Sequence, residues 1–301
     1  MQLDDLKIFL SVIRAGSFTD AAEQLMLSKQ YVSRRMAALE ETLGAQLLLR
    51  NTRKLSVTEA GHRFSQHAQR ILDDVLEAQQ DMSSDQQALQ GIFKISLPMS
   101  FGMSHLSPLL AEFLAMHPAL QFQVELADRY VDMVGEGFDI AIRIGTLPDS
   151  SLMARRFGEL KRLICASPDY LLRAGTPQMP EELRQHACLR FGREGINGWE
   201  LRHNGSTKLF DVSGPMVSNN GEVLRDAAVA GLGLVLLPDF IVAEALQERK
   251  LVQVLSGFEP APLNLTAVFP QHRQRSKFTR LFLDFLQQKL SQRFNGGGPR
   301  L

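Results

Sequence analysis

The chain has 301 residues, a 45% apolar fraction and a formal net charge of zero. This length favours about two domains, and the apolar fraction excludes a wholly disordered chain. Two cysteines are too few for a disulfide framework, the longest apolar stretch is interrupted by Pro238, Asp239 and Glu244, and acids stand where a signal peptide has bases. We therefore expect a soluble, cytoplasmic protein without a membrane partner.

Residues 3–43 predict three helices, the last two joined by a tight turn. Glycines end the first helix and the third, and Ser17 and Ser28 stand at the N-cap positions of the second and third. The third helix repeats apolar residues at steps of four, three and four, which places one buried face on it: Val32, Met36, Leu39 and Leu43. This arrangement indicates a helix-turn-helix.

The start of the third helix carries side chains that can reach base edges and phosphates in a major groove. Short strands at 47–49 and 55–57 predict a wing with a basic tip beside the sugar-phosphate backbone. Segment 28–54 holds six bases and two acids, a local charge of +4, although a solvated helix face would give the same count. The predicted contacts to double-stranded DNA are Ser28, Lys29, Gln30, Tyr31, Ser33, Arg34 and Arg35, with Arg50, Arg53 and Lys54 from the wing.

A helix from Thr58 to about Leu89 should follow, with Gly91 breaking it. Its apolar residues form a heptad seam, because they recur at steps of 4, 3, 4, 3 and 4: Phe64, Ala68, Ile71, Val75, Ala78 and Met82. Such a seam can pack on its own domain. We favour the alternative, pairing with a second copy of the chain.

From residue 92 short strands and helices alternate, which favours a mostly parallel sheet covered by helices. Expected strands are 93–97, 120–126, 138–144, 163–166, 188–191, 233–237 and 263–269, and a hairpin is expected at Asn204-Gly205. Expected helices are 107–117 (opened by Ser107 as N-cap), 130–136, 170–173, 180–185, 222–229, 240–248 and 276–294. The pattern restarts once and its last elements return to the first lobe, which indicates a bilobed α/β module with a ligand cleft.

In such sheets ligands bind at the carboxyl ends of strands, which singles out the loops 98–102, 144–146 and 217–221. Helix starts in these loops would direct backbone N–H groups at an anion. The alternative is that residues 219–221 only form a turn and a helix cap, and that the single tryptophan fills a core. The candidate ligand-binding residues are Ser100, Phe101, Gly145, Ser218, Asn219 and Asn220 from these loops, with Trp199; the family resemblance given below adds Phe191.

Two rival functions fit the sequence less well. A stand-alone small-molecule-binding protein would not need the first ninety residues. A nucleotide-dependent enzyme would need a third glycine after Gly231-Leu232-Gly233, where Leu236 stands. No catalytic triad, paired carboxylates or metal-ligand spacing occurs, so we expect no enzyme, no metal and no cofactor.

The chain resembles the LysR-type transcriptional regulators. The resemblance rests on Ala15-Gly16-Ser17-Phe18, Ala21-Ala22, Val32-Ser33-Arg34 and the Thr58-Glu59-Ala60-Gly61 segment, and three phrases at 128–145, 163–171 and 219–238 are similar to the CrgA-like subgroup. It implies a winged helix-turn-helix (1–58), a dimerising linker helix (59–90), a periplasmic-binding-protein-like effector domain (91–295) and a loose tail (296–301). It also implies lobes at about 91–163 with 267–295 and at about 164–266.

The same resemblance implies a homodimer or homotetramer that regulates transcription. A small, often anionic effector would switch it, and RNA polymerase would be its partner when it activates. Lys29, Gln30 and Tyr31 depart from the family pattern, so they are where an individual operator preference would lie. Some relatives sense oxidants with cysteines, but Cys165 falls in a predicted buried strand, so we expect no redox role.

Overall fold

The polypeptide divides into two units in the computed structural model: 1–93 with 119–121 and 132–138, and 94–118 with 122–131 and 139–301. All residues are described except 52–53, 83–88, 149, 193–197, 204–205 and 296–301. The predicted wing tip, the turn Asn204-Gly205, the end of the linker and the tail lie wholly or partly outside the described residues.

Three helices open the first unit: α1 (Leu3–Ala15), α2 (Phe18–Gln24) and α3 (Lys29–Leu43). Ser17 Oγ accepts from the backbone N–H of Asp20 at 3.0 Å, and Ser28 Oγ accepts from that of Tyr31 at 3.2 Å. Gly16 and Gly44 end α1 and α3 in the left-handed conformation, with φ of 68° and 62°. The predicted caps are therefore confirmed, because each depends only on neighbours in the chain.

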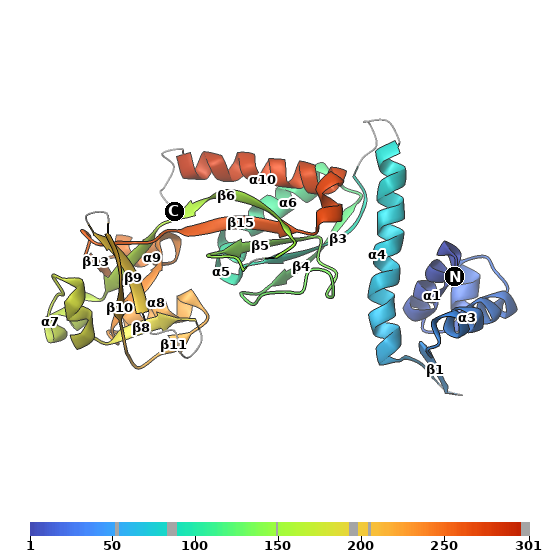
Figure 1. Cartoon of the computed structure of the whole chain (residues 1–301), viewed down its shortest axis with the longest axis horizontal. Helices are drawn as coiled ribbons and strands as arrows, with labels where there is room; N and C mark the ends of the chain where they lie inside the picture. Colours follow the sequence, from blue (N-terminus) through green and yellow to red (C-terminus); the bar gives the residue numbers. More distant parts are fainter. Residues whose placement is uncertain (52–53, 83–88, 149, 193–197, 204–205, 296–301) are drawn as a thin grey trace. The chain divides into compact units, whose positions relative to one another are not determined.

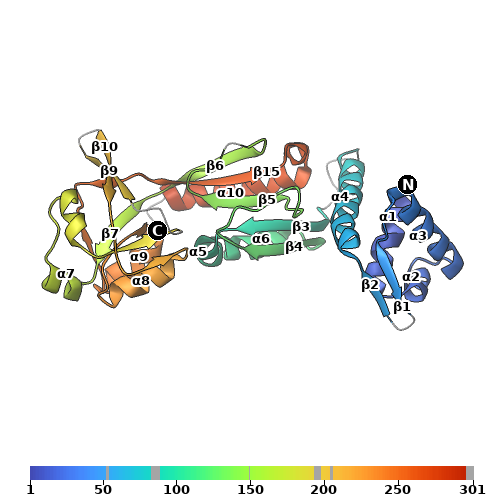
Figure 2. The ribbon, with the colours of Figure 1, turned by 60° about the horizontal axis from the view of Figure 1, so that its bottom comes forward.

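The wing strands β1 (Leu48–Asn51) and β2 (Lys54–Val57) pair antiparallel and extend from one end of the helical cluster (Figure 1, Figure 2). The Glu40 carboxylate of α3 accepts from the backbone N–H groups of Leu47 and Leu48 at 2.8 and 3.0 Å. Thr58 then caps α4 (Glu59–Met82), since its Oγ1 accepts from Gly61 N at 2.9 Å. A Cβ at Gly61 would lie 2.2 Å from Leu47 O, so this helix start requires glycine.

The linker seam divides into two parts. Phe64 packs on the helical core, with its ring 5.4 Å from that of Phe9, and Ala68 is fully buried there. Ile71 is 38% exposed, and Val75 is half-buried. Packing on its own domain, the alternative from the sequence, therefore holds for the first part of the seam.

The described part of α4 ends at Met82. Leu89 and Gln90 are not helical and lead directly into the strand that begins at Gly91, so the helix does not include Leu89; the rest of the predicted extension, residues 83–88, lies outside the described residues. Leu89 is buried, and it lies directly before the strand that begins at Gly91.

Two five-stranded sheets form the remainder, one in each lobe. Lobe I has the strand order β4-β3-β5-β15-β6, and lobe II has β11-β8-β12-β7-β13; a small sheet β10-β9-β14 flanks lobe II. The lobe I strands are β3 (Gly91–Leu97), β4 (Leu120–Leu126), β5 (Ile140–Ile144), β6 (Met153–Leu160) and β15 (Leu263–Phe269). The others are β7 (Arg162–Ala166), β8 (Cys188–Phe191), β9 (Gly198–His203), β10 (Ser206–Asp211), β11 (Val217–Ser218), β12 (Leu234–Pro238), β13 (Val252–Val254) and β14 (Glu259–Pro260).

Both sheets are mixed, because in each the predicted parallel arrangement is interrupted by a reversed strand. β3 pairs parallel with β5, but β15 runs antiparallel to both β5 and β6. In lobe II, β8 pairs parallel with β12, but β7 runs antiparallel to both β12 and β13. The antiparallel strands are those by which the chain changes lobe, between Leu160 and Arg162 and again between Pro260 and Leu263. The return to lobe I thus comes earlier than the expected boundary at 267.

Helices cover the sheets. Lobe I carries α5 (Met99–Phe101), a π-helical turn (Gly102–Leu106), α6 (Ser107–Met116), a 3-10 turn (Gln271–Arg275) and α10 (Lys277–Asn295). Lobe II carries α7 (Pro168–Ala174), a 3-10 turn (Pro180–Gln185), α8 (Gly221–Val229) and α9 (Asp239–Gln247). Figure 1 shows α10 lying along β6 and β15, and the rings of Phe113 and Phe282 join α6 to α10 at 5.0 Å.

Three sequence predictions fail in lobe I. Ser107 is not an N-cap, because helical residues already begin at Met99, whose N–H donates to Asp128 at 3.0 Å. Residues 130–136 form turns instead of a helix, because the Asp132 carboxylate accepts from the backbone N–H groups two and three residues ahead and so replaces helical bonds. Strand β6 was not predicted, since its outer face is polar and charged.

Candidate functional site

The first turns of α3 present polar side chains on the face opposite its buried stripe. Val32 and Met36 are fully buried, whereas Lys29, Gln30 and Tyr31 are exposed. Arg34 is exposed, and Ser33 is half-buried. The Arg34 guanidinium lies 5.6 Å from the centre of the Tyr31 ring, a cation–π arrangement that restricts where this arginine points.

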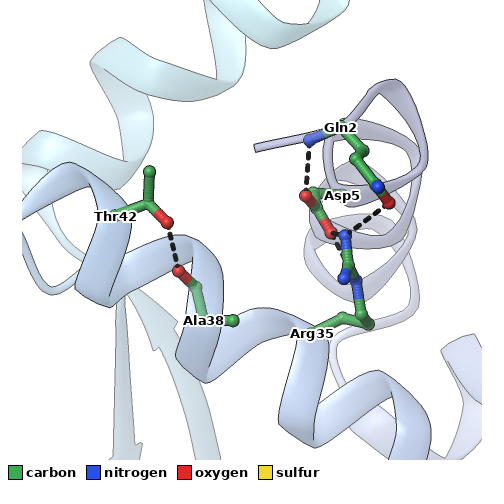
Figure 3. A network of polar contacts seen from close by, with 5 residues as sticks. All are labelled: Gln2, Asp5, Arg35, Ala38 and Thr42. Atoms are coloured by element: carbon green, nitrogen blue, oxygen red, sulfur yellow. Dashed lines mark hydrogen bonds and ion pairs between the residues drawn. The ribbon is translucent and has the colours of Figure 1, made fainter.

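Arg35, a predicted DNA contact, binds side chains of its own domain. Its Nε donates to Asp5 Oδ1 at 2.7 Å, its Nη2 donates to Gln2 Oε1 at 3.0 Å, and the Gln2 backbone N–H donates to Asp5 Oδ2 at 2.7 Å. Figure 3 shows this network between the start of α1 and α3, with Thr42 bonded to Ala38 further along α3. The guanidinium thus joins α3 to the start of α1, whereas the predicted DNA contact of Arg35 stays a prediction.

The wing residues are placed only in part. Arg50 lies on β1 and Lys54 on β2, at either side of the tip, while Arg53 lies outside the described residues. Glu40 of α3 accepts from Leu47 and Leu48 at the start of the first strand, and Thr58 at the start of α4 donates to the Leu47 carbonyl, so both helices hold the base of the wing.

A cavity of about 300 Å³ lies in the second unit between the two lobes. Four of the predicted ligand-binding residues line it: Ser100, Phe101, Phe191 and Trp199. Trp199 also belongs to the lobe II core, so both interpretations of this tryptophan hold. The remaining lining residues are Pro98, Asp128, Arg143, Ile144, Arg162, Gly198, Leu236, Leu237, Pro238, Phe240, Ile241 and Leu263.

The other predicted ligand-binding residues do not line this cavity. Asn220 caps α8 by accepting from Val223 N at 3.0 Å, so the helix-cap alternative is confirmed for this residue, and Ser218 Oγ accepts from Asn220 N at 3.1 Å. Gly145 turns the chain after β5 with φ of 111°. Ser218 and Asn219 border a separate, open hollow.

Sequence reasoning missed the charged groups of the cavity. Arg143 is buried on β5, Arg162 opens β7, and Asp128 follows β4. Burial lowers the pKa of Arg143, against the opposing effect of the Asp128 charge. Burial raises the pKa of Asp128, which the Met99 N–H and Arg143 oppose. A single arginine inside the apolar run Ile140–Ile144 was the available signal, because a charge in a buried strand requires a reason.

One hydrogen bond joins the lobes beside the cavity. The Ser100 hydroxyl of α5 donates to the Glu222 carboxylate of α8, and the Asn220 amide approaches the Met99 sulfur at 3.7 Å. A ligand contacting Ser100 would therefore touch a group that already connects lobe I to lobe II.

The two cysteines are buried in the lobe II sheet, Cys165 on β7 and Cys188 on β8, with β12 between these strands. Burial raises the pKa of both Cys165 and Cys188 to about 12. Thiolates are the reactive form, so both side chains serve as core residues at neutral pH. Within the described segments there is no cluster of metal-ligating side chains and no helix that is long and apolar enough to cross a bilayer.

Two known protein families match this chain, one in its N-terminal part and one in most of the remainder. Residues 3–62 match the family described as "Bacterial regulatory helix-turn-helix protein, lysR family", and residues 86–291 match "LysR substrate binding domain". The chain belongs to the LysR family. This LysR-family chain is 37% identical over 284 residues to the uncharacterized HTH-type transcriptional regulator YhjC of Escherichia coli, covering 93% of this chain and 95% of that protein. It is 35% identical over 297 residues to the regulator CrgA of Neisseria meningitidis serogroup B, covering 97% of this chain and 98% of that protein.

Solved structures give the same result for this LysR-family regulator. CrgA from Neisseria meningitidis matches with a TM-score of 0.60 and 34% identity, covering 96% of this chain and 99% of that one. The Vibrio cholerae virulence activator AphB matches with a TM-score of 0.59 and 31% identity, covering 95% and 98%. The resemblance, the winged helix-turn-helix and the α/β effector-binding domain are confirmed. The chain is a DNA-binding transcriptional regulator and not an enzyme.

Proposed function

We propose that this regulator recognises its operator through the exposed start of α3, with the wing on the DNA backbone. The base-reading residues are Lys29, Gln30, Tyr31, Ser33 and Arg34. Support comes from the division of α3 into a buried apolar face and an exposed polar face at its N-terminal turns. A recognition helix enters the major groove with this end, and arginine pairs best with guanine.

The wing supplies the sequence-independent part of binding. Arg50, Arg53 and Lys54 carry positive charge at the tip region of a two-stranded wing. Phosphate contacts of this kind set affinity and register but not sequence preference. Ser28 has a second use, because its hydroxyl caps α3 and positions the N-terminal turn.

The active form is an oligomer that pairs through α4 in the cytoplasm. The seam beyond Ala68 supports this pairing, since Ile71 and Val75 are not covered by the helical core. A homodimer would place two helix-turn-helix units on one operator, and a homotetramer four. When the regulator activates, RNA polymerase is the partner that it recruits. A small effector in the interlobe cavity switches the protein.

The test is fluorescence anisotropy with labelled DNA from the intergenic region upstream of the gene, in the presence of competitor DNA. Arg34→Ala should weaken specific binding by about 1–3 kcal/mol, as removal of a bidentate hydrogen-bonded base contact does. Arg202→Ala is the matched control, because this exposed arginine of β9 pairs with Glu259 far along the chain from α3. Equal affinity of wild type and Arg34→Ala would contradict the proposed readout.

A further inference from the structure

Arg143 is a buried cation whose partners are all uncharged. Its side chain donates from Nη1 to the carbonyl oxygens of Ile142 at 2.7 Å and Ser96 at 3.4 Å, and from Nη2 to Ser96 Oγ at 2.8 Å. It forms no ion pair with any residue of the described segments. The residue is only 6% exposed. The Asp128 charge acts on Arg143 without forming an ion pair with it. A buried charge without an ion-pair contact is costly, so an anion in reach would be bound favourably.

Arg273 in the same lobe shows the usual solution. It is 5% exposed, nearly the same as Arg143, and its guanidinium pairs with the Asp139 carboxylate at 2.9 Å. The fold therefore neutralises one of its buried arginines with a protein carboxylate. Arg143, in contrast, faces the cavity between the lobes without such a carboxylate.

The charges that line the cavity leave an excess of one positive charge. Arg143 and Arg162 contribute two, and the Asp128 carboxylate removes one when ionised. Asp128 accepts from Met99 N at 3.0 Å and forms no ion pair with Arg143. Arg162 donates its Nε–H to the Ala261 carbonyl at 2.7 Å, again an uncharged partner. One anionic group on the ligand would neutralise the excess positive charge of these three lining residues, whereas two anionic groups would leave an excess of negative charge.

The remaining wall is apolar and largely aromatic. Phe101 and Phe240 meet edge to face at 5.3 Å, and Trp199, Leu236 and Ile241 continue the surface. The cavity volume of about 300 Å³ is at the small end for ligand pockets, so it limits the body of the ligand to about the size of one ring.

We propose that the cavity binds a small monocarboxylate, with its carboxylate on the Arg143 guanidinium and its apolar body against the wall of Phe101, Trp199 and Phe240. The proposal rests on the proposed function, in which this cavity holds the effector. Guanidinium and carboxylate match in shape and charge, which makes Arg143 the anchor. A dicarboxylate would bring a second negative charge into a cavity that already holds the Asp128 carboxylate, and a neutral amide would leave Arg143 without an ion pair.

The first test needs no variant. Isothermal titration of the full-length protein would compare aromatic and short aliphatic monocarboxylates (benzoate, phenylacetate, hexanoate) with their amides and with succinate and glutarate. We expect saturable binding of at least one monocarboxylate, at least ten-fold tighter than its own amide and than either dicarboxylate. Failure of every monocarboxylate to bind, or tighter binding of an amide or a dicarboxylate, would overturn the proposal.

Variants then locate the carboxylate. Arg143→Gln should weaken binding of the best monocarboxylate about ten- to a hundred-fold, the usual loss for a hydrogen bond to a charged group. Asp128→Asn removes the cavity's negative charge yet keeps an oxygen for Met99 N, so it should tighten monocarboxylate binding and reduce the discrimination against succinate. Arg202→Gln, an exposed arginine of lobe II, is the matched control and should bind like wild type.

If Arg143→Gln does not fold, Asp128→Asn decides: unchanged affinity and unchanged discrimination would overturn the assignment. Operator binding is measured on the same preparations by gel shift. Specific DNA binding without any monocarboxylate binding would refute this inference alone. Absence of specific DNA binding in the wild type would instead refute the proposed function.

Discussion

Replacing Asp5 by alanine should weaken the attachment of α1 to α3 by about 2–3 kcal/mol. The Asp5 carboxylate accepts two hydrogen bonds of 2.7 Å, from Arg35 Nε and from the Gln2 backbone N–H. A hydrogen bond to a charged group contributes about 1.5–3 kcal/mol, and breaking a fully buried ion pair costs about 3–5 kcal/mol. The Asp5 side chain is 4% exposed but that of Arg35 is 24% exposed, so water recovers part of the loss at the arginine.

Hydrogen exchange of α1 and α3 amides in the full-length protein is the appropriate assay. Trp199 is the only tryptophan, and it lies in the other unit, so its fluorescence does not report on this contact. Arg35→Ala and the double variant complete a cycle. Because the two side chains act as a pair, we expect the double variant to be about 2 kcal/mol less destabilised than the sum of the single ones.

Lys7→Ala provides the control, since Lys7 forms only an exposed ion pair with Asp4 on the same helix. Such pairs contribute about 0–1 kcal/mol. Additive effects of Asp5→Ala and Arg35→Ala would refute the reasoning. So would an Arg35→Ala variant that keeps normal exchange but lowers the salt slope of DNA binding by about one, because that result would make Arg35 a phosphate contact.

Three further predictions concern other parts of the chain. Replacing both Arg53 and Lys54 by alanine should reduce the log–log salt slope of DNA binding by about 0.9 for each phosphate that the wing no longer neutralises, and an unchanged slope would exclude the wing from the interface. Val75→Asp places a charge on the uncovered part of the α4 seam and should yield smaller particles in sedimentation velocity; the wild-type oligomer would contradict pairing there. A pKa of about 12 leaves about one in ten thousand of the Cys165 and Cys188 thiols ionised at pH 8, so both should react with a thiol reagent only after unfolding in urea. Rapid reaction of the folded protein would show that the burial is wrong.

The N-terminal unit was largely predictable because its signals are local. A serine hydroxyl reaches a backbone N–H three residues ahead, so Ser17 and Ser28 mark helix starts wherever the chain lies in space. Gly16 and Gly44 mark helix ends for a similar reason, since they adopt a conformation that other residues avoid. Partners that come from elsewhere in the chain were not predictable in this way: Arg35 has the residue type of a DNA contact, and only the structure shows that Asp5 of α1 binds it.

The cavity was only half predictable. Ser100 follows from the rule that ligands meet the ends of strands, whereas Phe191 follows from the family resemblance. A polar residue at a helix start can satisfy either a ligand or its own backbone, and Asn220 does not line the cavity because its side chain caps α8.

By itself the sequence determined the helix boundaries of the DNA-binding unit, the buried stripe of α3 and the family to which the regulator belongs, because these depend on spacing along one chain. Only the tertiary structure decided which charges share a cavity. Asp128, Arg143 and Arg162 come from three separate elements, and the antiparallel crossings of β7 and β15 bring those elements together. The physical reason is that a buried charge is defined by the groups around it, and those groups are set by the packing of the lobes, which no local pattern encodes.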